Sequence, residues 1–171
     1  MVLALTGIAI AVIFGFLIYG ARQGTACVLA TALLLLLAWS VAVDLAPLAA
    51  HAVGPEGLPL AEHLRGEWMR NIFLALAPVA LFAGGILKRY VPLNFEAFDG
   101  LIGTLFGIGA GFLAAHLLLL AFLAAAVGTP AQAPLARSTA VRQLVHFDAL
   151  HGLHDLLTGQ VERNARADGA E

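Results

Sequence analysis

Four apolar stretches, each long enough to cross a lipid bilayer, constrain this sequence more than any other feature. A membrane span requires roughly 20 mainly apolar residues, or about 17 at the short end. Trp68 and Tyr90 bracket the short third stretch at positions typical of a membrane interface. The stretches lie at residues 2–19, about 25–45, about 72–87, and 101 to about 127.

The composition also indicates that lipid surrounds the chain. Of the 171 residues, 61% are hydrophobic and 12% are charged, whereas a soluble domain is about 45–50% apolar and about 25% charged. A soluble core cannot hide this much apolar surface, so we expect membrane lipid to surround the chain. The net charge of −2 carries no signature of nucleic-acid binding. Because Cys27 is the only cysteine, an intrachain disulfide is excluded.

The predicted fold is therefore all-α, an integral membrane four-helix bundle within residues 1–128. We expect Pro47 to end the second helix, because proline interrupts helical hydrogen bonding. Leu60, Leu64 and Trp68 then recur every four residues, which predicts a short interfacial helix between the second and third spans. A solvated loop anchored by the tryptophan is the alternative at this point.

Residues 129–171 differ in composition from the spans and are predicted to form a separate tail. Pro130 and Pro134 mark a linker after the fourth span. Apolar residues at helical spacing then predict an amphipathic C-terminal helix over residues 137–160. The last residues are expected to be disordered.

A glycine pattern opens the fourth span, in the segment "FDGLIGTLFGIGAGF" at residues 98–112. Gly103, Gly107 and Gly111 are spaced by four and so share one helix face. This doubled GxxxG stripe is the pattern that lets two membrane helices approach backbone to backbone. Three roles are open: packing on the first span, where Gly7 and Gly15 offer partners, contact within an oligomer, or lining of a path for a substrate.

Two polar residues within the spans are candidates for function. Asp44 is the only acid in the second stretch, and Ser40 lies one turn earlier, within hydrogen-bonding reach. A buried carboxylate in lipid is usually functional, but the length of the span also allows Asp44 to lie at the headgroups. His116 lies in the middle of the fourth stretch, where it either bonds inside the bundle or faces a polar cavity.

The tail carries the only pattern that resembles a metal site. His151, His154 and Asp155 fall in one sector of the expected helix, and imidazole with carboxylate suits zinc. A single helix supplies at most two or three ligands, so the polar face of an amphipathic helix is the alternative. The sequence has no nucleophile elbow, phosphate-binding loop or dinucleotide motif. We therefore expect no enzyme, no catalytic residue and no cofactor.

Three features of the sequence resemble the colicin V production protein family, CvpA. The first is a tight basic connector after the first span, "GFLIYGARQGTACVLATALL", with Arg22. The second is Asp99 in front of the glycine helix "GLIGTLFGIGAGF", and the third is Ser138 in "PLARSTAVRQLV", soon after the last span. The connector departs from the arginine-glycine pair of the family, and the histidine-bearing tail beyond Phe147 has no family counterpart.

The resemblance implies a small four-span protein of the bacterial inner membrane. It implies a part in colicin V-type toxin production or export, or in envelope homeostasis, and no catalytic residue. We expect such a protein to act through copies of itself or other membrane proteins. The competing hypothesis is a small oligomeric channel or transporter-like protein, in which the glycine helix lines the path.

Overall fold

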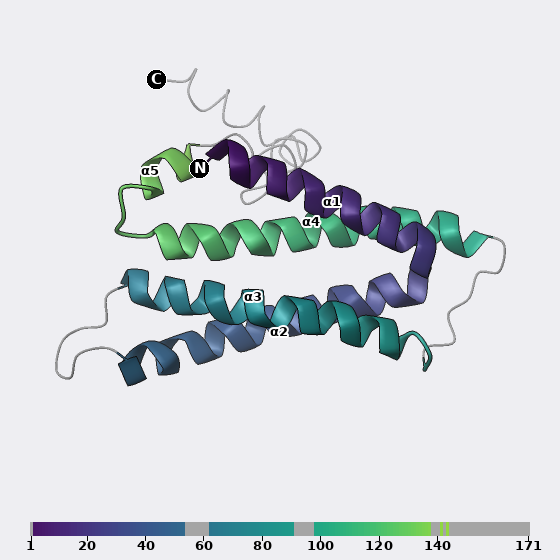
Figure 1. Ribbon diagram of the computed structural model, residues 1–171, viewed down its shortest axis with the longest axis horizontal. Helices are drawn as coiled ribbons and strands as arrows, with labels where there is room; N and C mark the ends of the chain where they lie inside the picture. The colour runs from purple at the N-terminus through teal and green to yellow at the C-terminus, as the bar shows by residue number, and fades with distance from the viewer. Residues whose placement is uncertain (1, 54–61, 91–97, 138–140, 142, 144–171) are drawn as a thin grey trace, which may run out of the picture.

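The structure is a computed structural model that describes residues 2–53, 62–90, 98–137, 141 and 143. This part of the chain contains helices and no strand, which confirms the predicted all-α class. Figure 1 shows how the helices follow one another along the chain. They are α1 (Val2–Gln23), α2 (Thr25–Val53), α3 (Glu62–Leu87), α4 (Asp99–Ala126) and α5 (Gln132–Ala136).

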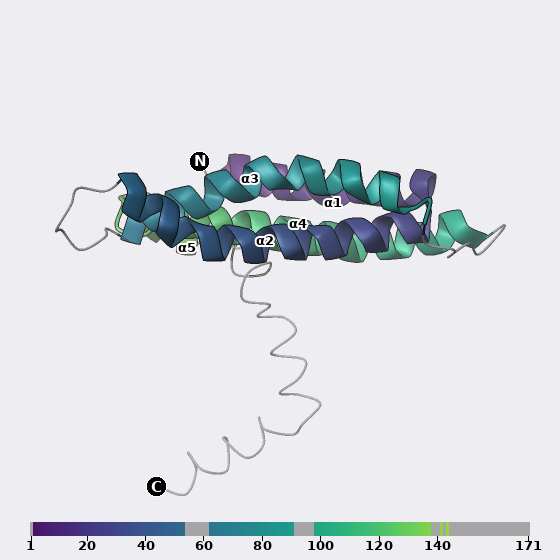
Figure 2. The ribbon, with the colours of Figure 1, turned by 90° about the horizontal axis from the view of Figure 1, so that it is seen from below.

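The four long helices run antiparallel in sequence order and form a bundle with two ends (Figure 1). One end, here called the Gly24 end, holds the turn from α1 to α2 and the start of α4. The opposite end, here called the Arg70 end, holds the start of α3, the end of α4 and α5. In side view, α1 and α3 form one layer and α2 and α4 the other (Figure 2).

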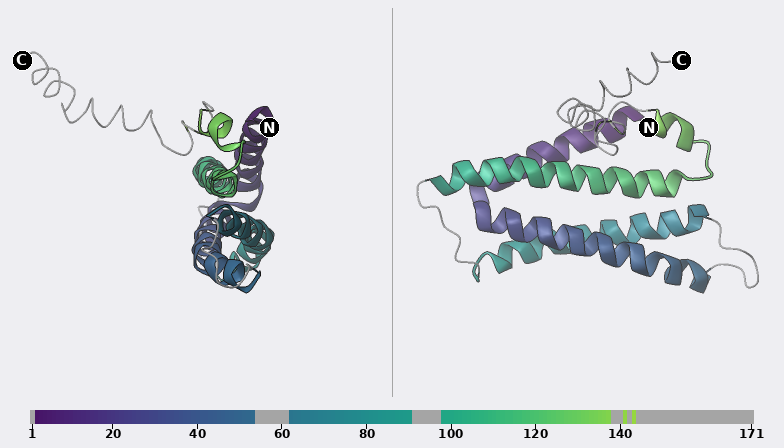
Figure 3. Two further views of the ribbon diagram at one scale, coloured as in Figure 1. Left: turned by 90° about the vertical axis from the view of Figure 1, so that its left-hand side faces the viewer. Right: turned by 180° about the vertical axis from the view of Figure 1, so that it is seen from behind.

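The helices associate as two pairs around a central member. α1 packs mainly on α4, and α2 packs mainly on α3. α4 also contacts both α2 and α3, and the end-on view shows it between α1 and the α2–α3 pair (Figure 3). The bundle is therefore joined along α4.

All four long helices are long and apolar enough to cross a membrane. Each also carries large apolar side chains on its outer face, including Phe14, Leu37, Phe82 and Leu105. An apolar outer surface of this extent favours lipid over water as the surrounding solvent. The chain is a multi-pass membrane protein.

Two helices are longer than the sequence predicted. α2 continues past Pro47 to Val53, so the expectation that Pro47 ends it was wrong. Proline is tolerated within membrane helices because neighbouring groups satisfy the freed carbonyl. The amphipathic turns around Trp68 belong to α3, which runs unbroken from Glu62. The interfacial segment and the third span are thus one helix in the described residues.

The tail contributes a short helix that covers one side of the Arg70 end. α5 forms within the predicted linker and includes Pro134. Leu135 and Val141 are buried in a cluster with Leu5 and Leu119, from α1 and α4. The beginning of the tail is thereby attached to the bundle. The rest of the amphipathic helix predicted for 137–160 lies almost wholly outside the described residues.

Candidate functional site

The glycine stripe of α4 lies directly against the backbone of α1. Gly103, Gly107 and Gly111 are all buried. A Cβ on Gly107 would lie 2.5 Å from the Phe16 carbonyl oxygen, and one on Gly111 would lie 2.9 Å from the Ile13 Cα. Both distances are shorter than real Cβ contacts allow, so this approach depends on glycine at these positions.

The partner glycine on α1 is not one of those that the sequence indicated. A Cβ on Gly7 or Gly15 would have no atom within 4 Å, so the expectation that these glycines receive the stripe was wrong. Gly20 takes this role, because a Cβ there would overlap the Gly103 carbonyl. α1 crosses α4 obliquely (Figure 1), which brings the helices together near the Gly24 end. Spacing along one helix does not reveal such a crossing point.

A second site lies at the Gly24 end, where Asp99 meets the turn between α1 and α2. Gly24 has a φ of 82°, a left-handed conformation that favours glycine, and its Cβ position is occupied by the Asp99 carboxylate. The Thr25 amide donates to Asp99 Oδ1 at 3.1 Å. The carboxylate from α4 therefore caps the N-terminus of α2, where the helix dipole favours a negative charge.

This corner joins two segments that lie far apart in the sequence. The basic connector and the residue before the glycine helix are more than seventy positions apart in sequence, yet the Thr25–Asp99 bond links them. Arg22 is exposed in the last turn of α1, where a cation suits the C-terminal end of the helix dipole. No hydrogen bond or ion pair of Arg22 is seen within the described part of the chain.

A polar cluster inside the bundle was not foreseen from the sequence. The Tyr19 hydroxyl lies 2.9 Å from Cys27 Sγ and 3.4 Å from Thr31 Oγ1. It also lies 3.5 Å from the Leu81 carbonyl oxygen. Cys27 and Thr31 are completely buried, and Gly84 packs on the Thr31 hydroxyl. The cluster links α1, α2 and α3 by polar contacts within lipid, where such contacts hold helices together.

Asp44 lies on the outside of α2 and is exposed. At 1.5 Å per residue it is about 29 Å beyond Thr25, close to the roughly 30 Å of the hydrocarbon core. This places the carboxylate near the headgroups when the Gly24 end is at the opposite interface. Ser40 does not bond to it, because its hydroxyl donates to the Leu36 carbonyl at 3.1 Å.

His116 is half-buried in α4, and its neighbours Ala115 and Leu117 are buried. Ser138 and the tail residues His151, His154 and Asp155 lie outside the described residues. Where the chain is described, no group of three or more histidine, cysteine or acidic side chains is arranged to hold a metal ion.

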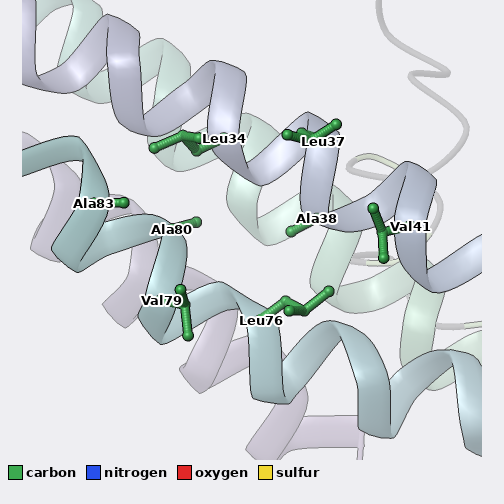
Figure 4. Close-up of a pocket in the computed structure, with 8 residues that line it drawn as sticks. All are labelled: Leu34, Leu37, Ala38, Val41, Leu76, Val79, Ala80 and Ala83. Atoms are coloured by element: carbon green, nitrogen blue, oxygen red, sulfur yellow. The ribbon is translucent and has the colours of Figure 1, made fainter. Parts of the chain in front are cut away.

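A stripe of alanines on α2 is a further packing feature that sequence analysis missed. Ala42, Ala46 and Ala50 recur every four residues and are completely buried. Ala38 continues the stripe and lies with Ala80 in a groove of about 180 Å³ between α2 and α3 (Figure 4). The spacing is visible in the sequence, but alanine is common in apolar helices and gives a weaker signal than glycine.

Comparison with known proteins found no matching family model, no matching curated protein and no matching solved structure.

Proposed function

We propose that this chain is a non-enzymatic protein of the bacterial inner membrane, of the CvpA type. It serves colicin V-type toxin production or export, or envelope homeostasis, by packing with copies of itself or with partner membrane proteins. The observation that carries the proposal is the corner at Gly24. The two segments that resemble the family, the connector after α1 and Asp99 before α4, are joined there by a hydrogen bond.

The outer face of α2 supports action through a partner. Leu33, Leu36 and Leu37 are exposed there, and Asp44 lies further along the same helix. Near the headgroups, at the end of this exposed face, the Asp44 carboxylate can accept a hydrogen bond from a partner helix. The face therefore suits another membrane protein or a second copy.

The family assignment is tested by complementation of a bacterial strain that lacks its CvpA protein. We expect the wild-type chain to restore colicin V production or tolerance of envelope stress. The Asp99→Ala variant should restore less, because it loses the link between α2 and α4. Wild-type protein that reaches the membrane at normal levels but restores neither property would contradict the proposal.

Partner contact is tested by a photo-crosslinking amino acid placed on α2. Position 37 is 59% exposed, whereas the neighbouring Leu35 is 3% exposed and serves as the matched control. We expect protein crosslinks from position 37 and none to other chains from position 35. Crosslinks to lipid alone from position 37 would contradict packing through this face.

The channel hypothesis finds less support in the geometry. The glycine stripe is covered by α1 within a single chain, so a path along it requires α1 to move away. Ion efflux from liposomes, at rest and under osmotic downshift, separates the two functions. We expect no flux from folded, inserted wild-type protein. Reproducible flux that is lost in Gly107→Leu would favour the channel.

A further inference from the structure

At the Arg70 end, α3 and α4 touch through their backbones and leave a cavity on each side of the contact. Gly66 makes the contact, because a Cβ there would overlap the Ala124 carbonyl. Arg65 lines one cavity, of about 260 Å³, together with Met69. Arg70 lines the other, of about 230 Å³. Two arginines thus flank one helix crossing.

The walls around Arg70 are largely apolar. Leu5 from α1, Phe122 from α4 and Leu135 from α5 line the same cavity. Thr129 adds a hydroxyl, which donates to the Ala126 carbonyl at 2.7 Å. The cavity therefore offers one cation beside hydrocarbon surface, a combination that matches an amphiphilic anion rather than a small polar solute.

The described hydrogen bonds of Arg70 do not neutralise its positive charge. Its Nε and Nη2 donate to Asn71 Oδ1 at 3.2 and 3.1 Å, and its guanidinium carbon lies 5.8 Å from the centre of the Phe122 ring. Arg65 is exposed, and so is Glu67, the described acid nearest to both in sequence. No ion pair of either arginine is seen among the residues that the structure places.

The depth of this site matches that of lipid headgroups. Arg70 precedes Lys88, the residue that follows α3, by about 27 Å at 1.5 Å per residue, close to the roughly 30 Å of the hydrocarbon core. When Lys88 and Arg89 lie at one membrane surface, Arg70 lies at the other. Its cavity then opens where phosphate groups and the first acyl carbons are found.

We propose that Arg70 and the cavity that it lines form a binding site for one anionic phospholipid. The phosphate accepts hydrogen bonds from the Arg70 guanidinium, and an acyl chain lies along the apolar wall at Phe122. Arginine suits this role because its planar donor fork pairs with phosphate oxygens. Basic pockets between membrane helices are known places for anionic headgroups.

The test uses the full chain in detergent, with phosphatidylglycerol or phosphatidylcholine added as short-chain lipids. We expect phosphatidylglycerol to raise Tm and to stay bound in native mass spectrometry, and phosphatidylcholine to do neither. In Arg70→Gln, the affinity for phosphatidylglycerol should fall about tenfold or more. Arg89→Gln, an exposed arginine at the other end, is the matched control and should keep wild-type affinity.

Inorganic phosphate distinguishes a lipid site from a simple anion site. We expect phosphate alone to leave Tm unchanged, because it gains nothing from the apolar wall. Equal stabilisation by both lipids, full stabilisation by phosphate alone, or undiminished binding by Arg70→Gln would each overturn the proposal. If Arg70→Gln does not fold, Arg70→Lys keeps the charge but lacks the planar donor fork, and it should still bind phosphatidylglycerol more weakly than the wild type. Wild-type affinity in Arg70→Lys would then overturn the guanidinium site.

Discussion

The two helix pairs of this bundle are held together in different ways. α1 and α4 meet through backbone atoms, with glycine on both sides at Gly20 and Gly107. α2 and α3 meet mainly through side chains, such as the edge-to-face rings of Trp39 and Phe73, whose centres are 5.5 Å apart. The exception among the described residues is Gly84, which packs closely on Thr31. The α2–α3 pair also leaves an open groove between residues 34–41 and 76–83.

The two pairs therefore differ in how strongly they depend on individual residues. Lipid supplies no hydrophobic drive for helix association, so close van der Waals contact must supply it. In the α1–α4 pair that contact needs the absence of side chains at a few positions. In the α2–α3 pair it is spread over many side chains, which can adjust. We therefore expect substitutions to be far more damaging in the first pair.

The largest expected effect is that of Gly107→Leu. A side chain here meets the Phe16 carbonyl, which cannot move without displacing α1. We expect the unfolding free energy to fall by about 3 kcal/mol or more, which lowers Tm by roughly 6–12 °C, or we expect a shift in oligomer size. Thermal unfolding and size-exclusion chromatography in detergent measure these changes.

Gly109→Leu is the matched control for this experiment. Gly109 lies in the same helix, is exposed, and has nothing within 4 Å of its Cβ position. We expect its Tm and oligomer size to equal those of the wild type. Equal losses in both variants would show that the helix tolerates no large residue and that the α1 contact is not the cause. Wild-type values in Gly107→Leu would contradict the packing role of that glycine.

A smaller loss is expected from Asp99→Ala. The variant leaves the Thr25 amide without its carboxylate partner, and loss of a helix N-cap typically costs about 1 kcal/mol. Hydrogen exchange should increase at the start of α2 and remain unchanged at its centre. Asp44→Ala is the control. It removes an exposed carboxylate from α2 and should leave hydrogen exchange at Thr25 unaffected.

The smallest effect is expected in the α2–α3 groove. Ala38 lines the groove, so the leucine of Ala38→Leu can extend into open space. We expect a change in unfolding free energy below about 1 kcal/mol. Ala42→Leu is the comparison, since Ala42 is completely buried one turn away and overpacking there should cost about 1–3 kcal/mol. If Ala38→Leu lowered the unfolding free energy more than Ala42→Leu, the groove would not be open to a larger side chain, and our description of the α2–α3 pair would be wrong.

The sequence was sufficient to predict the all-α fold and the four spans, because an uninterrupted apolar helix of this length is stable mainly in lipid. It was less informative about where helices end. Pro47 was expected to stop α2 but does not, because its neighbours in the bundle and not the local sequence decide whether a proline is tolerated.

The contacts between helices were harder to predict than the helices themselves. The glycine spacing identified one face of α4, but the crossing that selects Gly20 over Gly7 depends on the angle between helices. The bond from Asp99 to Thr25 and the cluster around Tyr19 join residues from different helices. No pattern within a single segment indicates which distant segment it meets.

The most direct test of the α1–α4 contact is a double-mutant cycle between Gly20→Ala and Gly107→Ala, measured by unfolding in detergent. A Cβ on Gly20 would lie 3.1 Å from the Gly107 Cα. Once one methyl group has separated the helices, the second should add little. We predict a coupling free energy of about 1 kcal/mol or more for this pair and near zero for Gly15→Ala with Gly107→Ala. Additive losses in both cycles would contradict backbone contact between α1 and α4.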